Sequence, residues 1–107
     1  MQYAKRPWGF WINLIVRGHF KVKLICFKKG GKLSMQKHQY RDELWCFLSG
    51  WGYMISENGT RRFTGKGNVF NISRQTWHQY IALKKTWVLE IQSGAKCEET
   101  DIERKDD

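Results

Sequence analysis

Short apolar segments, separated by turns that contain glycine, make up most of this chain. β-Branched and aromatic residues dominate these segments, as is typical of strands. No stretch of twelve or more residues has a 3.6-residue apolar period, so the pattern does not predict a long helix. The expected strands are residues 11–16, 20–27, 44–48, 53–56, 69–72, 77–83 and 87–91.

The breaks between these segments carry strong turn signals. Asn58-Gly59, between residues 53–56 and 61–63, predicts a hairpin with a two-residue loop. Glycine also marks the breaks at residues 29–31, 49–50 and 65–67. Regularly spaced short strands in a chain of 107 residues predict an all-β sandwich or small barrel. The polar, acidic end at residues 98–107 is expected to form a short helix or a draped tail.

Composition supports one compact domain. The chain is 41% hydrophobic and 15% aromatic, which is enough for a core and too apolar for a disordered tail. No apolar run approaches the ~18–20 residues that span a bilayer, and residues 1–8 lack the apolar core of a secretion signal. We therefore expect a cytoplasmic domain without membrane contact. Its three separated cysteines, Cys26, Cys46 and Cys97, are expected to be reduced thiols.

Charge is unevenly distributed along the chain. The formal net charge is +9, with 19 Lys and Arg against 10 Asp and Glu. Residues 96–107 hold three basic and six acidic side chains, a net of −3, so residues 1–95 carry +12. A body this basic attracts anions. Charge alone does not distinguish a polynucleotide from a small phosphorylated molecule.

A few polar residues could bind a metal ion. If residues 36–40 are extended, Gln36, His38 and Tyr40 share one face, because strand side chains alternate. Glu43 joins that face if the strand bends, and His78 comes from a later strand. Imidazole, carboxylate and amide ligands suit a divalent ion such as Zn²⁺, Fe²⁺, Co²⁺, Mn²⁺ or Ni²⁺. Taken singly, a histidine on a strand is more often a hydrogen-bonded structural residue.

The spacing of these residues resembles the two motifs of the cupin family. The first motif, His-x-His-x(2–4)-Glu-x6-Gly, is matched at His38, Glu43 and Gly50. The second motif, Gly-x5-Pro-x-Gly-x2-His, is matched at Gly67 and His78. The resemblance implies an all-β fold, the double-stranded β-helix or jelly-roll barrel.

Four further segments resemble one branch of this family, the C-terminal cupin domain of type II mannose-6-phosphate isomerases, often fused to a mannose-1-phosphate guanylyltransferase. That branch carries Arg-Pro-Trp-Gly, Leu-Ser-Leu-Gln, Ile-Glu-Val-Gln-x-Gly and Glu-Asp-Asp-Ile-x-Arg in this order. The corresponding segments here are residues 6–9, 33–36, 89–94 and 99–104. The resemblance implies one cupin domain over residues 1–107, with an acidic C-terminal segment at 96–107, that pairs as a homodimer.

By the same resemblance, the chain is expected to be a metal-dependent isomerase that interconverts mannose 6-phosphate and fructose 6-phosphate. The implied metal ligands are Gln36, His38, Glu43 and His78. The side chains expected to contact the phosphorylated sugar, or a nucleotide sugar, are Arg6, Lys23, Arg41, Trp45 and Gln92. The group that moves the proton is not identified by the motifs, and the candidates are Tyr40, Lys37 and Arg41.

Two alternatives remain open from the sequence. Tyr40 stands where the first motif has its second histidine, which favours a non-catalytic cupin that binds a sugar phosphate or nucleotide sugar without turnover. The basic body and its aromatic residues would also suit a small nucleic-acid-binding barrel. The motifs weigh against nucleic acid, because they direct polar residues into a pocket rather than aromatic residues onto an exposed sheet.

Overall fold

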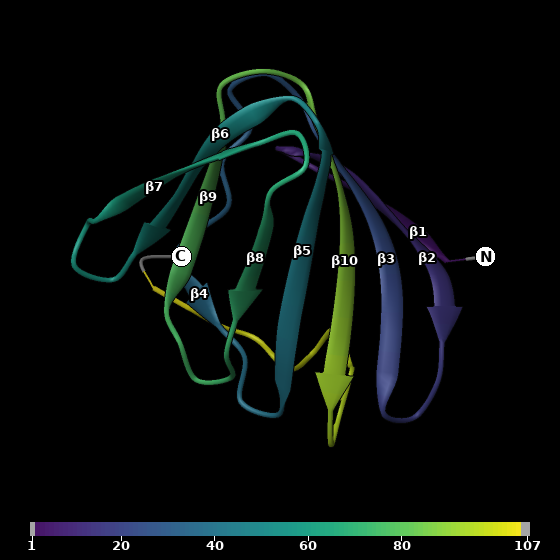
Figure 1. Ribbon diagram of the computed structural model, residues 1–107. Coiled ribbons are helices and arrows are strands. Elements are labelled where there is room, and N and C mark those ends of the chain that lie inside the picture. The colour runs from purple at the N-terminus through teal and green to yellow at the C-terminus, as the bar shows by residue number, and fades with distance from the viewer. Residues whose placement is uncertain (1, 106–107) are drawn as a thin grey trace.

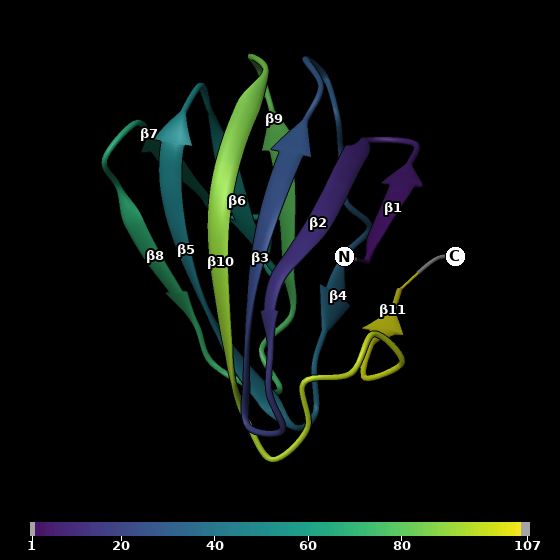
Figure 2. The same ribbon diagram turned by 90° about the vertical axis from the view of Figure 1, so that its right-hand side faces the viewer.

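The computed structural model describes residues 2–105, which form strands and turns and contain no helix (Figure 1). Within this range no helix is therefore long or apolar enough to cross a membrane. Two antiparallel sheets face each other as the walls of a barrel (Figures 1 and 2). The predicted all-β class is confirmed.

The larger sheet has six strands and the smaller one five, within the described residues. In spatial order the larger sheet contains β1 (Tyr3–Arg6), β2 (Gly9–Val16), β3 (Phe20–Phe27), β10 (Thr86–Gly94), β5 (Arg41–Ser49) and β8 (Val69–Ile72). The smaller sheet contains β11 (Glu103–Arg104), β4 (Gln36–Lys37), β9 (His78–Ala82), β6 (Trp51–Ser56) and β7 (Arg61–Gly65).

The barrel interior is apolar in one part and polar in another. On β5 and β10 alternate residues are buried, so each strand contributes every second side chain to the interior. The apolar part includes Phe27, Trp45 and Tyr80, each at most 1% exposed. Further along the same two strands, Glu43 lies opposite Gln92 and both are buried. The polar part of the interior therefore continues directly from the hydrophobic core.

Most predicted strands are present with small shifts at their ends. Strands 20–27 and 69–72 match β3 and β8 at both ends. The strands β1, β4 and β11 were not predicted, because they are two to four residues long and rich in charged or polar side chains. Short polar strands carry no alternating apolar signal, so only pairing with a neighbour reveals them.

The hairpin between β6 and β7 is confirmed, but its predicted two-residue loop is wrong. Ser56 N–H donates to the Thr60 carbonyl at 3.0 Å, which leaves Glu57, Asn58 and Gly59 in the loop. A two-residue type I′ loop requires positive φ at both central residues. In this loop only Gly59 has positive φ, +87°, and a three-residue loop needs only one such residue.

The acidic C-terminal end is draped around the barrel rather than helical. From the end of β10 the chain turns back and adds β11 to the edge of β4 (Figure 2). The Asp101 carboxylate accepts hydrogen bonds from the backbone N–H groups of Gln39 and Tyr40, at 2.9 and 3.0 Å. The helix alternative is therefore wrong for residues 98–105, and Asp106 and Asp107 lie outside the described residues.

We expect Gly94→Ala to destabilise the fold by about 2 kcal/mol. Gly94 has a φ of +152°, which residues with side chains rarely adopt. A Cβ there would lie 2.2 Å from the Tyr40 carbonyl oxygen, and this backbone atom cannot avoid the clash by a change of rotamer. Urea denaturation gives the free energy of unfolding. Gly18→Ala is the control, because a Cβ at Gly18 meets nothing within 4 Å. Equal stability of the two variants would contradict the close approach.

Candidate metal centre and anion pocket

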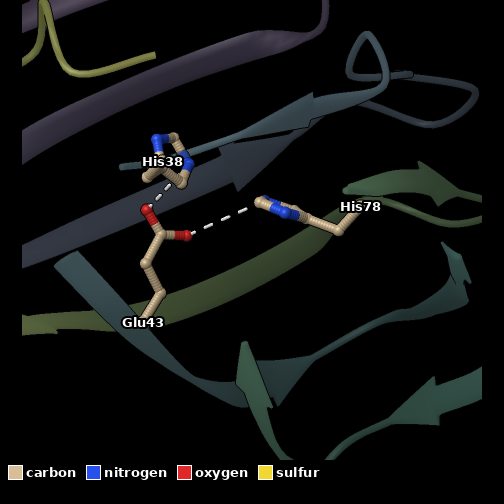
Figure 3. A group of neighbouring side chains, drawn as sticks. All are labelled: His38, Glu43 and His78. Carbon is tan, nitrogen blue, oxygen red and sulfur yellow. Dashed lines mark ion pairs between the residues drawn. The ribbon is translucent and has the colours of Figure 1, made fainter. Parts of the chain in front are cut away.

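Three buried side chains from different segments meet inside the barrel. His38 follows β4, Glu43 lies on β5, His78 begins β9, and all three are at most 3% exposed. His38 Nε2 lies 3.1 Å from Glu43 Oε2, and His78 Nε2 lies 4.0 Å from Glu43 Oε1 (Figure 3). Their possible ligand atoms all lie within 4.8 Å of one another. The structure thus brings these predicted ligands together, while their binding of a metal stays a prediction.

Backbone hydrogen bonds set the orientation of both imidazoles. His38 Nδ1 lies 2.8 Å from the Asp101 carbonyl oxygen, and His78 Nδ1 lies 3.1 Å from that of Thr76. A carbonyl oxygen only accepts, so each Nδ1 carries a proton, and Nε2 of the neutral ring keeps a lone pair. Burial lowers the pKa of His38, which favours its neutral form.

The two Nε2 atoms fit a cation. Both are buried and have no hydrogen-bond partner among the described residues, which is uncommon for buried polar atoms. Each directs a lone pair toward the Glu43 carboxylate, and such an arrangement is repulsive unless a positive group lies between. Two imidazoles and a carboxylate form a common ligand set for divalent transition metals. His38, Glu43 and His78 therefore fit the predicted ion.

Glu43 is held as an anion by its own strand. Its Oε2 accepts from Arg41 Nε at 2.9 Å and its Oε1 accepts from Trp45 Nε1 at 3.0 Å. Burial alone would raise the pKa of Glu43, but its electrostatic interactions with His38, Arg41 and His78 and the hydrogen bond from Trp45 lower it to about 2. Trp45, predicted to bind substrate, is 1% exposed and packs in the aromatic core. Its indole N–H orients the Glu43 carboxylate.

Gln36 and Tyr40 differ in where they point. Gln36 is buried, pairs in register with His78 and lines the same pocket as His38. The chain bends after β4, at residues 39–40, so the alternation stops there. Tyr40 is 43% exposed, with Lys96 Nζ 4.8 Å from its ring centroid. The prediction that Tyr40 shares the face of Gln36 and His38 is wrong, and Arg41 is the next inward side chain.

A cavity of about 140 Å³ lies beside the candidate ligands and is strongly charged. Four of the predicted substrate contacts line this cavity, namely Arg6, Lys23, Arg41 and Trp45. Lys37 is not among the lining residues, and its Nζ lies 4.9 Å from the Trp77 ring centroid. The other charged side chains in the lining are Glu43, Glu90, Glu99 and Arg104.

Glu90 is a functional candidate to which the motifs gave no role. It is 4% exposed and lines the cavity. Gln92, a predicted substrate contact, is fully buried and is not among the lining residues, and its Nε2 donates to Glu90 Oε1 at 2.6 Å. Burial raises the pKa of Glu90 to about 8, and the negative charge of Glu43 adds to the rise. The alternation along β10 directs both side chains inward. A buried carboxyl facing a cavity is a candidate for proton transfer.

Comparison with known families gives one match over the whole chain. The family model described as mannose-6-phosphate isomerase C-terminal matches residues 1–107. The alginate biosynthesis protein AlgA of Pseudomonas aeruginosa is 33% identical over 106 residues, covering 95% of this chain and 21% of its own length. A mannose-1-phosphate guanylyltransferase of Klebsiella pneumoniae is 36% identical over 104 residues, covering 92% and 21%. The chain thus spans about a fifth of the length of these curated relatives.

Solved structures with the same architecture share little sequence with this chain. KdgF from Halomonas sp. superposes with a TM-score of 0.78 at 17% identity, covering 91% of this chain and 89% of that one. A sugar phosphate isomerase of the cupin superfamily from Silicibacter pomeroyi gives 0.63 at 18% identity, covering 70% and 50%. These likenesses concern the fold alone, and they confirm the predicted cupin double-stranded β-helix.

We expect chelator-treated protein to bind one Zn²⁺ or Mn²⁺ ion per chain. In His38→Ala and His78→Ala the affinity should fall by at least about 100-fold, because each variant removes one of two imidazole ligands. Isothermal titration calorimetry measures both affinity and stoichiometry. His19→Ala is the matched control, since His19 is exposed and outside the cluster. Unchanged affinity in the two cluster variants would contradict the site.

We expect Glu90→Gln to be more stable than the wild type, by a margin that grows between about pH 5 and pH 8. Glu90 has a raised pKa, so the folded state keeps a proton there that the unfolded state releases. The free energy of unfolding of the wild type therefore falls as pH rises through this window, and the glutamine removes that loss. Urea denaturation of chelator-treated protein measures it, with the exposed Glu57→Gln as control. A pH-independent difference would count against a buried, protonated Glu90.

Proposed function

This chain belongs to the mannose-6-phosphate isomerase C-terminal family of cupins, and from that premise we propose that it is a divalent-metal-dependent isomerase interconverting mannose 6-phosphate and fructose 6-phosphate. One observation carries the proposal. Two buried imidazole Nε2 atoms without hydrogen-bond partners among the described residues converge on the Glu43 carboxylate, at the wall of a cavity lined by cationic side chains.

The cationic side chains of the cavity suit a phosphorylated sugar. Arg6, Lys23 and Arg41 line the cavity from three different strands. A guanidinium binds phosphate oxygens through two parallel hydrogen bonds, and an ammonium contributes a point charge. The Arg41 guanidinium already donates to Glu43 and to the Glu98 carbonyl, at 2.9 and 2.7 Å, so its orientation is fixed before a ligand enters.

Aldose–ketose isomerisation transfers a proton between C2 and C1 of the open-chain sugar through an enediol. A divalent ion held by His38, Glu43 and His78, with Gln36 beside them, would act as a Lewis acid toward the sugar oxygens at C1 and C2. The chain itself must supply a group that accepts the proton from one carbon and returns it to the other.

Glu90 is the group best located for this proton transfer. Its Oε1 accepts the Gln92 amide at 2.6 Å, and the carboxyl lines the cavity. The pKa of Glu90 is about 8, so its carboxylate form is in equilibrium with the acid near neutral pH. That carboxylate would take the proton from C2 and return it to C1, while the hydroxyl proton on O2 passes to O1, so Glu90 ends as the carboxylate with which it began. Tyr40 and Lys37 are not among the cavity-lining residues, and the Arg41 guanidinium is engaged by Glu43. We therefore prefer Glu90 to these three candidates.

A second function, binding of a sugar phosphate or nucleotide sugar without turnover, is favoured by a specific observation. Tyr40, at the position of the motif's second histidine, points away from the cavity and supplies no ligand there. In addition, the Arg41 guanidinium lies on Glu43 Oε2, which offsets negative charge that an ion would use. A weaker metal site would still leave the cationic cavity able to bind a phosphate.

We expect the metal-replete protein to form fructose 6-phosphate from mannose 6-phosphate in a coupled assay. His38→Ala and Glu90→Gln should each lower kcat/KM by at least about 100-fold, since they remove a ligand and the proton-transfer group. The matched controls, His19→Ala and Glu57→Gln, should retain activity. Binding of mannose 6-phosphate to metal-replete wild type without turnover would reject the isomerase and support the second function.

A further inference from the structure

A carboxylate from the C-terminal segment, Glu99, lines the cavity together with Lys23 and binds two lysines of β3. Glu99 Oε2 lies 3.1 Å from Lys21 Nζ and 2.7 Å from Lys23 Nζ. Both lysines lie on β3, two residues apart, and alternation directs both inward, where each is 4% exposed. Glu99 reaches them from a segment more than 70 residues away in the sequence.

Two ammonium groups buried side by side need an anionic partner. Burying a charged group without a partner is costly, so lysine is rarely buried unless paired. Here both ammonium groups share one oxygen of one carboxylate, which balances only one of their two charges. A phosphate monoester carries up to two negative charges and several acceptor oxygens. It would therefore satisfy Lys21 and Lys23 more completely than Glu99 does.

Glu99 can leave the lysines while its backbone stays in place. On one side of it the Glu98 carbonyl accepts from Arg41 Nη1 at 2.7 Å, and on the other side the Asp101 carboxylate is bound to backbone N–H groups. The Glu99 side chain itself is 40% exposed, so rotation about its own bonds moves the carboxylate into solvent. Burial opposes its ionisation, but Lys23 and Lys21 lower the pKa of Glu99 below its usual value.

We infer that Lys21 and Lys23 form a phosphate subsite, and that Glu99 is an internal competitor that a phosphate group displaces on binding. The identity of the sugar that carries the phosphate rests on the proposed function, whereas the anion site itself does not depend on it. The affinity for phosphorylated ligands is then set by competition between the Glu99 carboxylate and the ligand phosphate for the same two ammonium groups. Removing the carboxylate should strengthen phosphate binding, although it also removes two ion pairs.

Titration of inorganic phosphate into chelator-treated protein tests this inference without metal or turnover. We expect Glu99→Gln and Glu99→Ala to bind phosphate about tenfold more tightly than the wild type, as measured by calorimetry. The glutamine variant keeps the side-chain volume if alanine destabilises the fold. Glu98→Gln is the matched control, because it removes the same charge from the adjacent residue, which takes part through its backbone carbonyl.

The second arm tests the lysines. In the Glu99→Gln background, Lys21→Met should weaken phosphate binding by about tenfold or more. Equal affinity of wild type and Glu99→Gln would overturn the competition, and equal affinity with and without Lys21 would overturn the subsite. Failure of the isomerase assay together with tighter phosphate binding by Glu99→Gln would reject the proposed reaction and leave the subsite standing. Isomerase turnover by the wild type, together with a phosphate affinity that neither Glu99→Gln nor Lys21→Met changes, would reject the subsite and leave the proposed reaction standing.

Discussion

The buried Glu43 carboxylate is the interaction on which the polar part of the barrel depends. At 2% exposure it is stable as an anion only because donors surround it. Two of them, Arg41 and Trp45, lie two residues before and after it on β5, so strand alternation alone directs them to the same side. The same strand then continues into the aromatic core, which fixes its register. The two imidazoles are arranged around a carboxylate that is already held in place.

Two carboxyl groups inside one barrel are held in different protonation states. Electrostatic interactions with His38 and Arg41 keep the pKa of Glu43 low, at about 2, despite its burial. Burial raises the pKa of Glu90 to about 8, and the charge of Glu43 strengthens that effect. The protonated state of Glu90 therefore depends in part on the negative charge of Glu43. Paired groups whose environments separate their pKa values are typical of sites that divide binding and proton transfer between two residues.

Much of the fold and part of the site follow from local patterns. The apolar segments between turn signals predicted both ends of β3 and of β8 correctly. The spacing of the cupin motifs selected His38, Glu43 and His78. The errors arise where a distant segment decides the local conformation. The bend that turns Tyr40 outward is bound by Asp101, 61 residues later.

The ion pair of Lys21 with Glu99 spans 78 residues. A single sequence gives a basic strand and an acidic tail, but it contains no signal for which carboxylate reaches which lysine. The charge difference between residues 1–95 and 96–107 was visible in the composition. Which acidic side chain lies beside which lysine could be seen only from the path of the chain beyond β10. The Asp101 contact also determines when the site can form, because its carbonyl oxygen accepts from His38 Nδ1. During synthesis the histidine emerges before its partner, which lies 63 residues later in the chain. The final orientation of this imidazole must therefore follow synthesis of the C-terminal segment, even if the sheets have already paired.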